Sequence, residues 1–153
     1  MDLALHQPEL IQAIASMLES YWEIKKNLAQ NNGVATQKAG QALLMQLERV
    51  ERTRFRVLQG LFFQQVYREL QFDVEHISET QLANHQREHF GDVSQNMAHL
   101  LKAFQFNHDK VYHDVCPGSS QHWLSLLPND QANPFSGPKQ SACSPVSVVE
   151  AAK

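Results

Sequence analysis

Thiols and imidazoles in the last third of the chain are the side chains best suited to chemistry. The only cysteines are Cys116 and Cys143, and three histidines stand within eight positions of the first: His108, His113 and His122. Thiolate sulfur and imidazole nitrogen together suit copper(I) or zinc. The spacing matches no zinc finger, because neither cysteine belongs to a Cys-x-x-Cys pair.

The same two cysteines could instead form a disulfide. In an oxidising compartment, closing this loop would stabilise the protein by roughly 3 kcal/mol and pin the tail of the chain. In a reducing compartment both thiols would stay free. A metal site, a Cys116–Cys143 bridge and two free thiols therefore all stay open at this point.

A second pair of imidazoles, His85 and His89, lies four positions apart in a segment of helical pattern. Side chains at this spacing share one helix face and can hold a metal. No glutamate directly follows the first histidine, so the pattern is not that of a zincin. His89 borders the apolar stripe, which favours a hydrogen-bonded histidine at the edge of the core.

Recognisable catalytic motifs are absent from the sequence. There is no Gly-x-Ser-x-Gly turn, no glycine-rich phosphate loop and no alternation of strands with helices to hold one. Cys116 with a nearby histidine could form a nucleophile pair, but a Pro-Gly turn would hold that geometry poorly. We therefore expect that the protein is not an enzyme.

The bulk composition limits the classes of protein that the chain can belong to. It has 153 residues, 42% hydrophobic and 19% charged, with a formal net charge of −3, which predicts one globular domain. The negative charge argues against nucleic acid as a partner. No run of 18 or more apolar residues occurs, so we expect no membrane-spanning helix. The start of the chain lacks a signal-peptide pattern, which fits either a cytoplasmic protein or a mature exported domain with an added methionine.

Apolar residues recur at helical spacing through the first hundred positions. The pattern predicts helices at about 10–28, 34–50 and 53–72. No clear breaker separates the second helix from the third. For the fourth helix, Ser78 to Gln81 has the form of a capping box, and the apolar stripe continues to Phe104.

Four amphipathic helices with short loops predict an all-α fold, an antiparallel four-helix bundle over residues 1–106. Residues 107–153, which we call the strap, hold five of the six prolines and both cysteines. Such a segment cannot be a long helix. We expect it to pack on the bundle within one single domain, with Trp123 as an anchor and a short strand at 110–115.

Two segments resemble a bacterial domain of unknown function, found alone or appended to membrane-fusion subunits of copper and heavy-metal efflux pumps. The segments are NHQREHFGDVSQNMAHLLKAF, at 84–104, and VYHDVCPG with HWLS, NPFSGP and AC, at 111–143. The matching positions are Gln86, Arg87, Phe90, Ser94, Tyr112, Cys116, Pro117, Trp123, Leu124, Ser125, Asn133, Pro134, Phe135, Gly137 and Cys143.

The resemblance implies a periplasmic or otherwise exported helical bundle linked to copper or heavy-metal handling. It also implies ligands: the paired cysteines, the methionines beside them and a histidine near the first cysteine. This chain departs from that set, because Gly118 and Gln140 stand where the family has methionines, Ser144 replaces a glycine and Val115 stands where a histidine often precedes the first cysteine. Losing both thioethers removes the soft ligands that favour copper(I).

The first hypothesis is a non-enzymatic exported domain that binds copper(I) or another soft metal. Its ligands would be Cys116, Cys143 and His113, with His122 or His108 assisting. The alternative is a structural or protein-interaction module with bridged cysteines and no cofactor, docking on an envelope or efflux-system protein. A third interpretation is a cytoplasmic helical adaptor with inert thiols.

Overall fold

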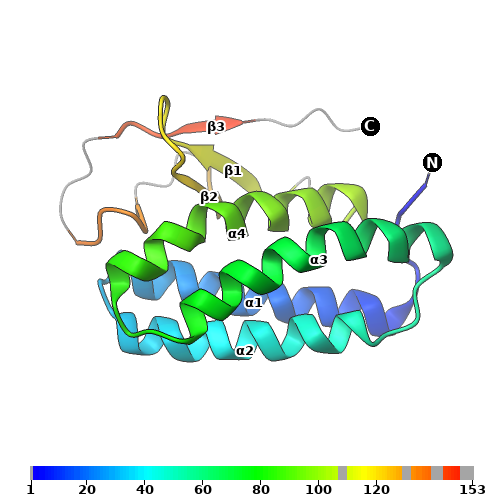
Figure 1. Cartoon of the computed structure of the whole chain (residues 1–153). Coiled ribbons are helices and arrows are strands. Elements are labelled where there is room, and N and C mark those ends of the chain that lie inside the picture. Colours follow the sequence, from blue (N-terminus) through cyan, green and yellow to red (C-terminus); the bar gives the residue numbers. More distant parts are fainter. Residues whose placement is uncertain (1, 107–109, 129–131, 139–142, 149–153) are drawn as a thin grey trace.

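Four helices make up most of the molecule, and each runs antiparallel to the helix before it in the sequence (Figure 1). The computed structural model describes residues 2–106, 110–128, 132–138 and 143–148. The helices are α1 (Pro8–Ala29), α2 (Gly33–Glu51), α3 (Val57–Ser78) and α4 (Ala83–Ala103). Each packs chiefly on the helix next to it in the sequence. This arrangement confirms the predicted helical bundle.

A small sheet in the strap makes the all-α prediction incomplete. Strands β1 (Tyr112–Val115), β2 (His122–Ser125) and β3 (Val146–Val148) form an antiparallel sheet in the order β2-β1-β3. β1 falls within the strand expected at 110–115. The turn after β1 contains Pro117 and Gly118, whose positive φ of 77° suits glycine and reverses the chain. A proline-rich chain that cannot form a helix satisfies its backbone groups by pairing with itself.

The boundary between α3 and α4 differs from the predicted one. Ser78 does not cap α4; it is the last residue of α3, and its hydroxyl donates to the carbonyl oxygen of Glu75. The residue that precedes α4 is Leu82, whose side chain makes no capping hydrogen bond. The helix continues past 72 because Val74 and Ile77 extend its buried stripe by another turn and a half. The capping-box prediction was therefore wrong.

The core lies between the four helices and extends under the strap. Among its fully buried side chains are Tyr21, Phe63, Phe90 and Trp123. Trp123 comes from β2, which packs on α4, and its burial confirms the predicted anchor. The strap therefore shares one core with the bundle.

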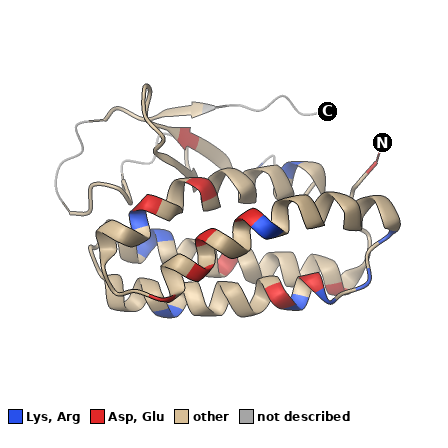
Figure 2. Ribbon diagram, in the orientation of Figure 1, with Lys and Arg blue, Asp and Glu red and all other residues tan. Residues whose placement is uncertain are grey.

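Several acidic residues lie on one side of the bundle. Figure 2 shows them along α3 and α4 on the side in view. There, a groove between the two helices is lined by Glu69, Asp73 and Asp92, with Arg68 among its basic residues. None of the helices in the described ranges combines the length and the apolar composition needed to cross a bilayer.

Candidate functional site

The two cysteines of the strap are joined. Cys116 and Cys143 form a disulfide with an S–S distance of 2.08 Å and a Cα–Cα distance of 5.8 Å. The sequence left three states of the cysteines open, and the structure shows the disulfide. A metal needs thiolates, so neither sulfur can serve as a ligand in this state.

The fold brings together two of the predicted ligands, His113 on β1 and His122 on β2. The Nε2 atom of His113 lies 3.0 Å from Nδ1 of His122, and the side-chain nitrogen of Gln95 lies 3.3 Å from Nε2 of His122. Because the Gln95 amide donates to Nε2, the Nδ1–H of His122 donates to His113, and His122 is neutral. Burial lowers the pKa of His122, although the nearby charge of Asp92 opposes the effect. The remaining predicted ligand, His108, lies outside the described residues.

These imidazoles do not share a face of the sheet with the bridge. Side chains alternate along a strand, so His113 and Val115 point to one face while Asp114 and Cys116 point to the other. Over the described ranges, no three His, Cys, Asp or Glu side chains already converge as the ligands of a metal would. The assignment of Cys116, Cys143 and His113 to one metal stays a prediction that requires a reduced protein.

A buried polar network links the sheet to α1. The Lys25 ammonium donates to the Ser125 hydroxyl at 3.0 Å, and this hydroxyl donates to Asp114 at 2.7 Å. Ser147 of β3 donates to the other oxygen of Asp114 at 2.6 Å. Asp114 and Ser125 are fully buried, and the hydrogen bonds compensate for the loss of water around these polar groups. The network fixes the three strands to each other and to the bundle.

A second buried connection uses Tyr21 of α1. Its hydroxyl accepts the backbone N–H of Leu124 at 2.8 Å and donates to Ser94 at 2.6 Å, while Ser94 donates to the carbonyl oxygen of Phe90. The ring of Tyr21 also stacks on Phe90. Burial raises the pKa of Tyr21 well above its usual range, which keeps the hydroxyl protonated as a donor. Ser94, Phe90 and Leu124 are among the positions that carry the family resemblance, and here they build the core.

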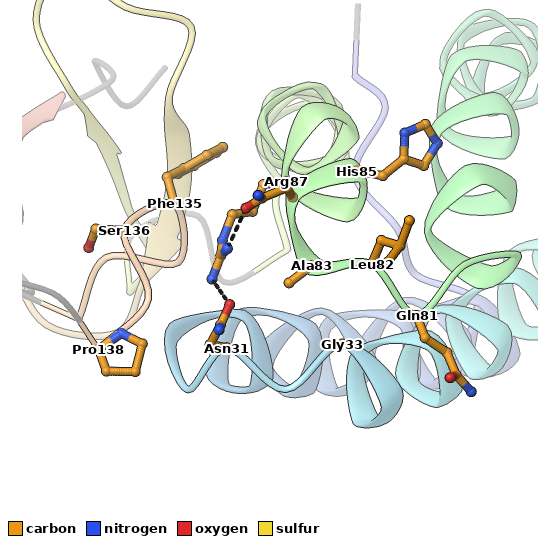
Figure 3. Close-up of a pocket in the computed structure, with 11 residues that line it drawn as sticks. Asn31, Gly33, Gln81, Leu82, Ala83, His85, Arg87, Phe135, Ser136 and Pro138 are labelled. Carbon is orange, nitrogen blue, oxygen red and sulfur yellow. Dashed lines mark hydrogen bonds between the residues drawn. The ribbon is translucent and has the colours of Figure 1, made fainter.

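Arg87 clamps the strap to the bundle beside a cleft of about 740 Å³. Its guanidinium donates to the carbonyl oxygens of Pro134 and Leu28, each at 2.8 Å, and to the Asn31 side chain at 3.0 Å. Figure 3 shows Arg87 reaching toward Asn31, between the helices and the strap residue Phe135. Burial lowers the pKa of Arg87. With its donors engaged by backbone and amide oxygens, Arg87 holds the fold together and offers little to a ligand.

On the other side of α4, three imidazoles gather where α3 ends and α4 begins. His76 lies in the last turn of α3, and His85 and His89 lie in the first two turns of α4. The ring centroids are 4.4 Å apart for His76 and His89, 5.1 Å for His85 and His89, and 5.9 Å for His76 and His85. Figure 3 shows His85 pointing away from Arg87, toward α3. We call these three residues the histidine trio.

Each ring of the trio is held through its Nδ1 atom. Nδ1 of His89 lies 2.8 Å from Asp73, that of His85 lies 3.1 Å from Glu88, and that of His76 lies 2.8 Å from the carbonyl oxygen of Phe72. The contact with Asp73 confirms the expected hydrogen-bonded histidine at the edge of the core. Burial raises the pKa of Asp73, and the hydrogen bond from His89 opposes that rise.

Sequence reasoning missed His76 as a member of this group. The third helix was expected to end near position 72, which left His76 in a loop. The stripe Leu70, Val74 and Ile77 was the available signal, because its spacing continues the helix through His76. Antiparallel packing of α3 on α4 then places His76 opposite His89.

Together, the fold and these clusters define a helical bundle with a disulfide-bridged strap. A family model described as a protein of unknown function, DUF3347, matches residues 17–109, more than half of the chain. The chain belongs to this family, which confirms the expected domain of unknown function. The match runs from α1 to just beyond α4, so it covers the bundle rather than the bridge. No curated protein and no solved structure matches the chain.

Proposed function

We propose that the protein is a non-enzymatic, exported domain that binds a transition-metal ion through histidine side chains. The metal-binding hypothesis drawn from the sequence is kept, but the ligands change. One observation carries the proposal: the cysteines are bridged, whereas five imidazoles of the described residues form two close groups, the histidine trio and the His113–His122 pair. Imidazole is the commonest metal ligand among side chains.

The non-enzymatic part of the proposal rests on the burial of Ser125, whose hydroxyl a substrate cannot reach. The contact between Lys25 and Ser125 has the composition of a serine–lysine nucleophile pair. The Ser125 hydroxyl, however, is fully buried and donates to Asp114. A substrate could not reach it without the sheet leaving the bundle, so the contact serves the fold.

The exported location is supported by the bridge, because structural disulfides persist in oxidising compartments. An envelope or efflux-system partner follows from the motif resemblance and belongs to the same proposal. In such a compartment a histidine site has an advantage, since it binds metal while the disulfide stays intact.

The test is a competition for Zn²⁺ and Cu²⁺ between the oxidised protein and a chromophoric chelator. We expect stoichiometric binding, and we expect the Cys116→Ser, Cys143→Ser double variant to bind equally well. Failure of the wild type to withdraw either ion from the chelator would overturn the proposal. Copper(I) offered to the reduced protein provides the contrast: binding seen only there, and lost in the double variant, would identify the cysteines as ligands.

The competing function is a structural or protein-interaction module that binds no metal. The contacts within the fold favour this second function, because Arg87, Tyr21 and Ser94 all make their hydrogen bonds to other parts of the same chain. The chelator competition separates the two functions directly: a module of this kind leaves every ion with the chelator and still loses stability when the bridge is removed.

A further inference from the structure

We propose that His76, His85 and His89 bind one divalent ion of the Zn²⁺ or Cu²⁺ type at the junction of α3 and α4. This site rests on the proposed function, since it assumes that histidine is the ligand. It goes further by choosing between the two groups of imidazoles and by assigning each ring a ligand atom. The experiment below distinguishes two negative results: an ion that binds elsewhere on the protein, and a protein that binds no ion.

The spacing of the three rings is the first argument. A tetrahedral ion held at about 2.0–2.1 Å from each nitrogen places the centroids of its imidazole ligands roughly 5 Å apart. The centroid separations in the trio, 4.4, 5.1 and 5.9 Å, bracket this value. The two helix backbones therefore hold the ring centres at about the separations that a shared ion requires, although the ring nitrogens do not converge on one point in the present orientations.

The hydrogen bonds of the trio are the second argument. Each Nδ1 atom faces an oxygen acceptor: Asp73 for His89, Glu88 for His85 and a backbone carbonyl for His76. Each ring therefore carries its hydrogen on Nδ1 and presents the lone pair of Nε2 when neutral. No other described residue hydrogen-bonds to these three Nε2 atoms. Metal-bound histidines characteristically donate their second N–H to a carboxylate or a carbonyl, as His89 does to Asp73.

The His113–His122 pair has a different geometry. There, both nitrogens of His122 already interact, one with Gln95 and one with His113. An ion would have to displace these contacts, and the pair offers two imidazoles where the trio offers three. The trio is therefore the better candidate.

The chemistry of the trio selects the class of ion. Imidazole nitrogen suits Zn²⁺, Cu²⁺ and Ni²⁺, whereas Mg²⁺ and Ca²⁺ prefer oxygen. Copper(I) prefers soft sulfur ligands, which the trio lacks. Asp73 and Glu88 would place negative charge beside the bound cation. Half-exposed His85, with 41% of its side chain accessible, gives the ion a way in.

Binding requires the rings to turn. His76 and His89 now stack with an angle of 25° between their planes, an arrangement in which two nitrogens do not converge on one point. An ion therefore requires His76 and His85 to rotate about their side-chain bonds and to give up their present Nδ1 contacts, whereas His89 would keep its hydrogen bond with Asp73. The helix backbones fix the positions of the three histidines, and the bound ion would fix the orientations of their rings.

The experiment measures Zn²⁺ affinity by chelator competition for His76→Gln and His85→Gln. Both residues are partly exposed, so the variants should keep the fold, which circular dichroism checks. We expect each to weaken binding by more than tenfold, and Asp73→Asn to weaken it about 10- to 100-fold because the neutral amide is a weaker acceptor for the His89 N–H and carries no negative charge. His99→Gln is the matched control, because His99 is exposed on the same helix and lies outside the trio.

NMR gives a readout that a merely structural role would not move. One equivalent of Zn²⁺ should shift the imidazole signals of His76, His85 and His89 and leave those of His113 and His122 in place. If Zn²⁺ binds but His122→Gln abolishes binding while the trio variants retain it, the site is wrong and histidine binding survives. If the wild type takes up no Zn²⁺, both proposals fall.

Discussion

At the scale of single residues, one hydroxyl joins three parts of the protein. Tyr21 of α1 contacts Ser94 of α4 and the backbone of Leu124 in the strap. A buried N–H without an acceptor costs about 1–3 kcal/mol. The position of β2 on the bundle is therefore specified by a directional contact, in addition to the apolar burial of Trp123.

His122 should make stability depend on pH. Burial lowers its pKa below the ordinary value of 6.5, so above that value neither the folded nor the unfolded chain carries the proton. As the pH falls below 6.5, the unfolded chain binds the proton first and stability is lost, until the folded pKa is passed. We expect wild type to lose more stability between pH 7 and pH 5 than His122→Gln does.

Urea unfolding at both pH values measures this difference. The groups that face His122 are His113 on the neighbouring strand and Gln95 and Asp92 on α4. Asp92 attracts the protonated ring and reduces the effect without cancelling it. Equal losses of stability in wild type and variant would show that His122 does not contribute.

At the scale of elements, the strap depends on its bridge. The disulfide closes a loop between positions separated by 27 in the sequence. For a loop of this length, the loss of unfolded-chain entropy corresponds to roughly 3–4 kcal/mol. The Cys116→Ser, Cys143→Ser double variant should therefore have a markedly lower free energy of unfolding, with the helices unchanged.

Chemical denaturation, together with circular dichroism, checks this expectation. The helices should keep their signal because their contacts with each other do not involve the bridge. A double variant as stable as wild type would mean that the other contacts of the strap, such as those of Arg87, Tyr21 and Trp123, hold it without the bridge.

At the scale of the whole molecule, metal binding should raise the melting temperature. An ion that binds only the folded protein stabilises it by about 2.7 kcal/mol at a free concentration of 100 times Kd. We expect Zn²⁺ to raise the melting temperature of wild type and of His99→Gln, and to raise that of His85→Gln by a clearly smaller amount at the same Zn²⁺ concentration. Calorimetry with and without Zn²⁺ measures the shift, and equal shifts in all three proteins would point to another site.

The sequence predicts the helices better than the site, for a physical reason. Helical stripes are local, so the bundle follows from the sequence. Trp123 was expected as an anchor of the strap because of its size and apolar character, and it is fully buried. The pairing of β1 with β3 joins segments about thirty positions apart, and no local pattern encodes it. The state of Cys116 and Cys143 likewise depends on a Cα–Cα distance that only the folded chain sets.

The histidine trio shows the same limit at a finer level. The i, i+4 spacing of His85 and His89 is visible in the sequence, but the partner His76 depends on where α3 ends. An error of about one and a half turns at one helix end concealed the third ring. Patterns of period 3.6 identify a face of one helix, whereas a site between two helices also requires their relative register.

The bridge also changes how the protein would respond to proteases. Because Cys116 and Cys143 are joined, the chain between them is a closed covalent ring. A single cut inside that ring breaks the polypeptide but releases no fragment, and the contacts of Arg87 and Trp123 continue to hold both new ends near the bundle. Outside the cell, where proteases are common and reductants are scarce, a nicked molecule would remain a single particle.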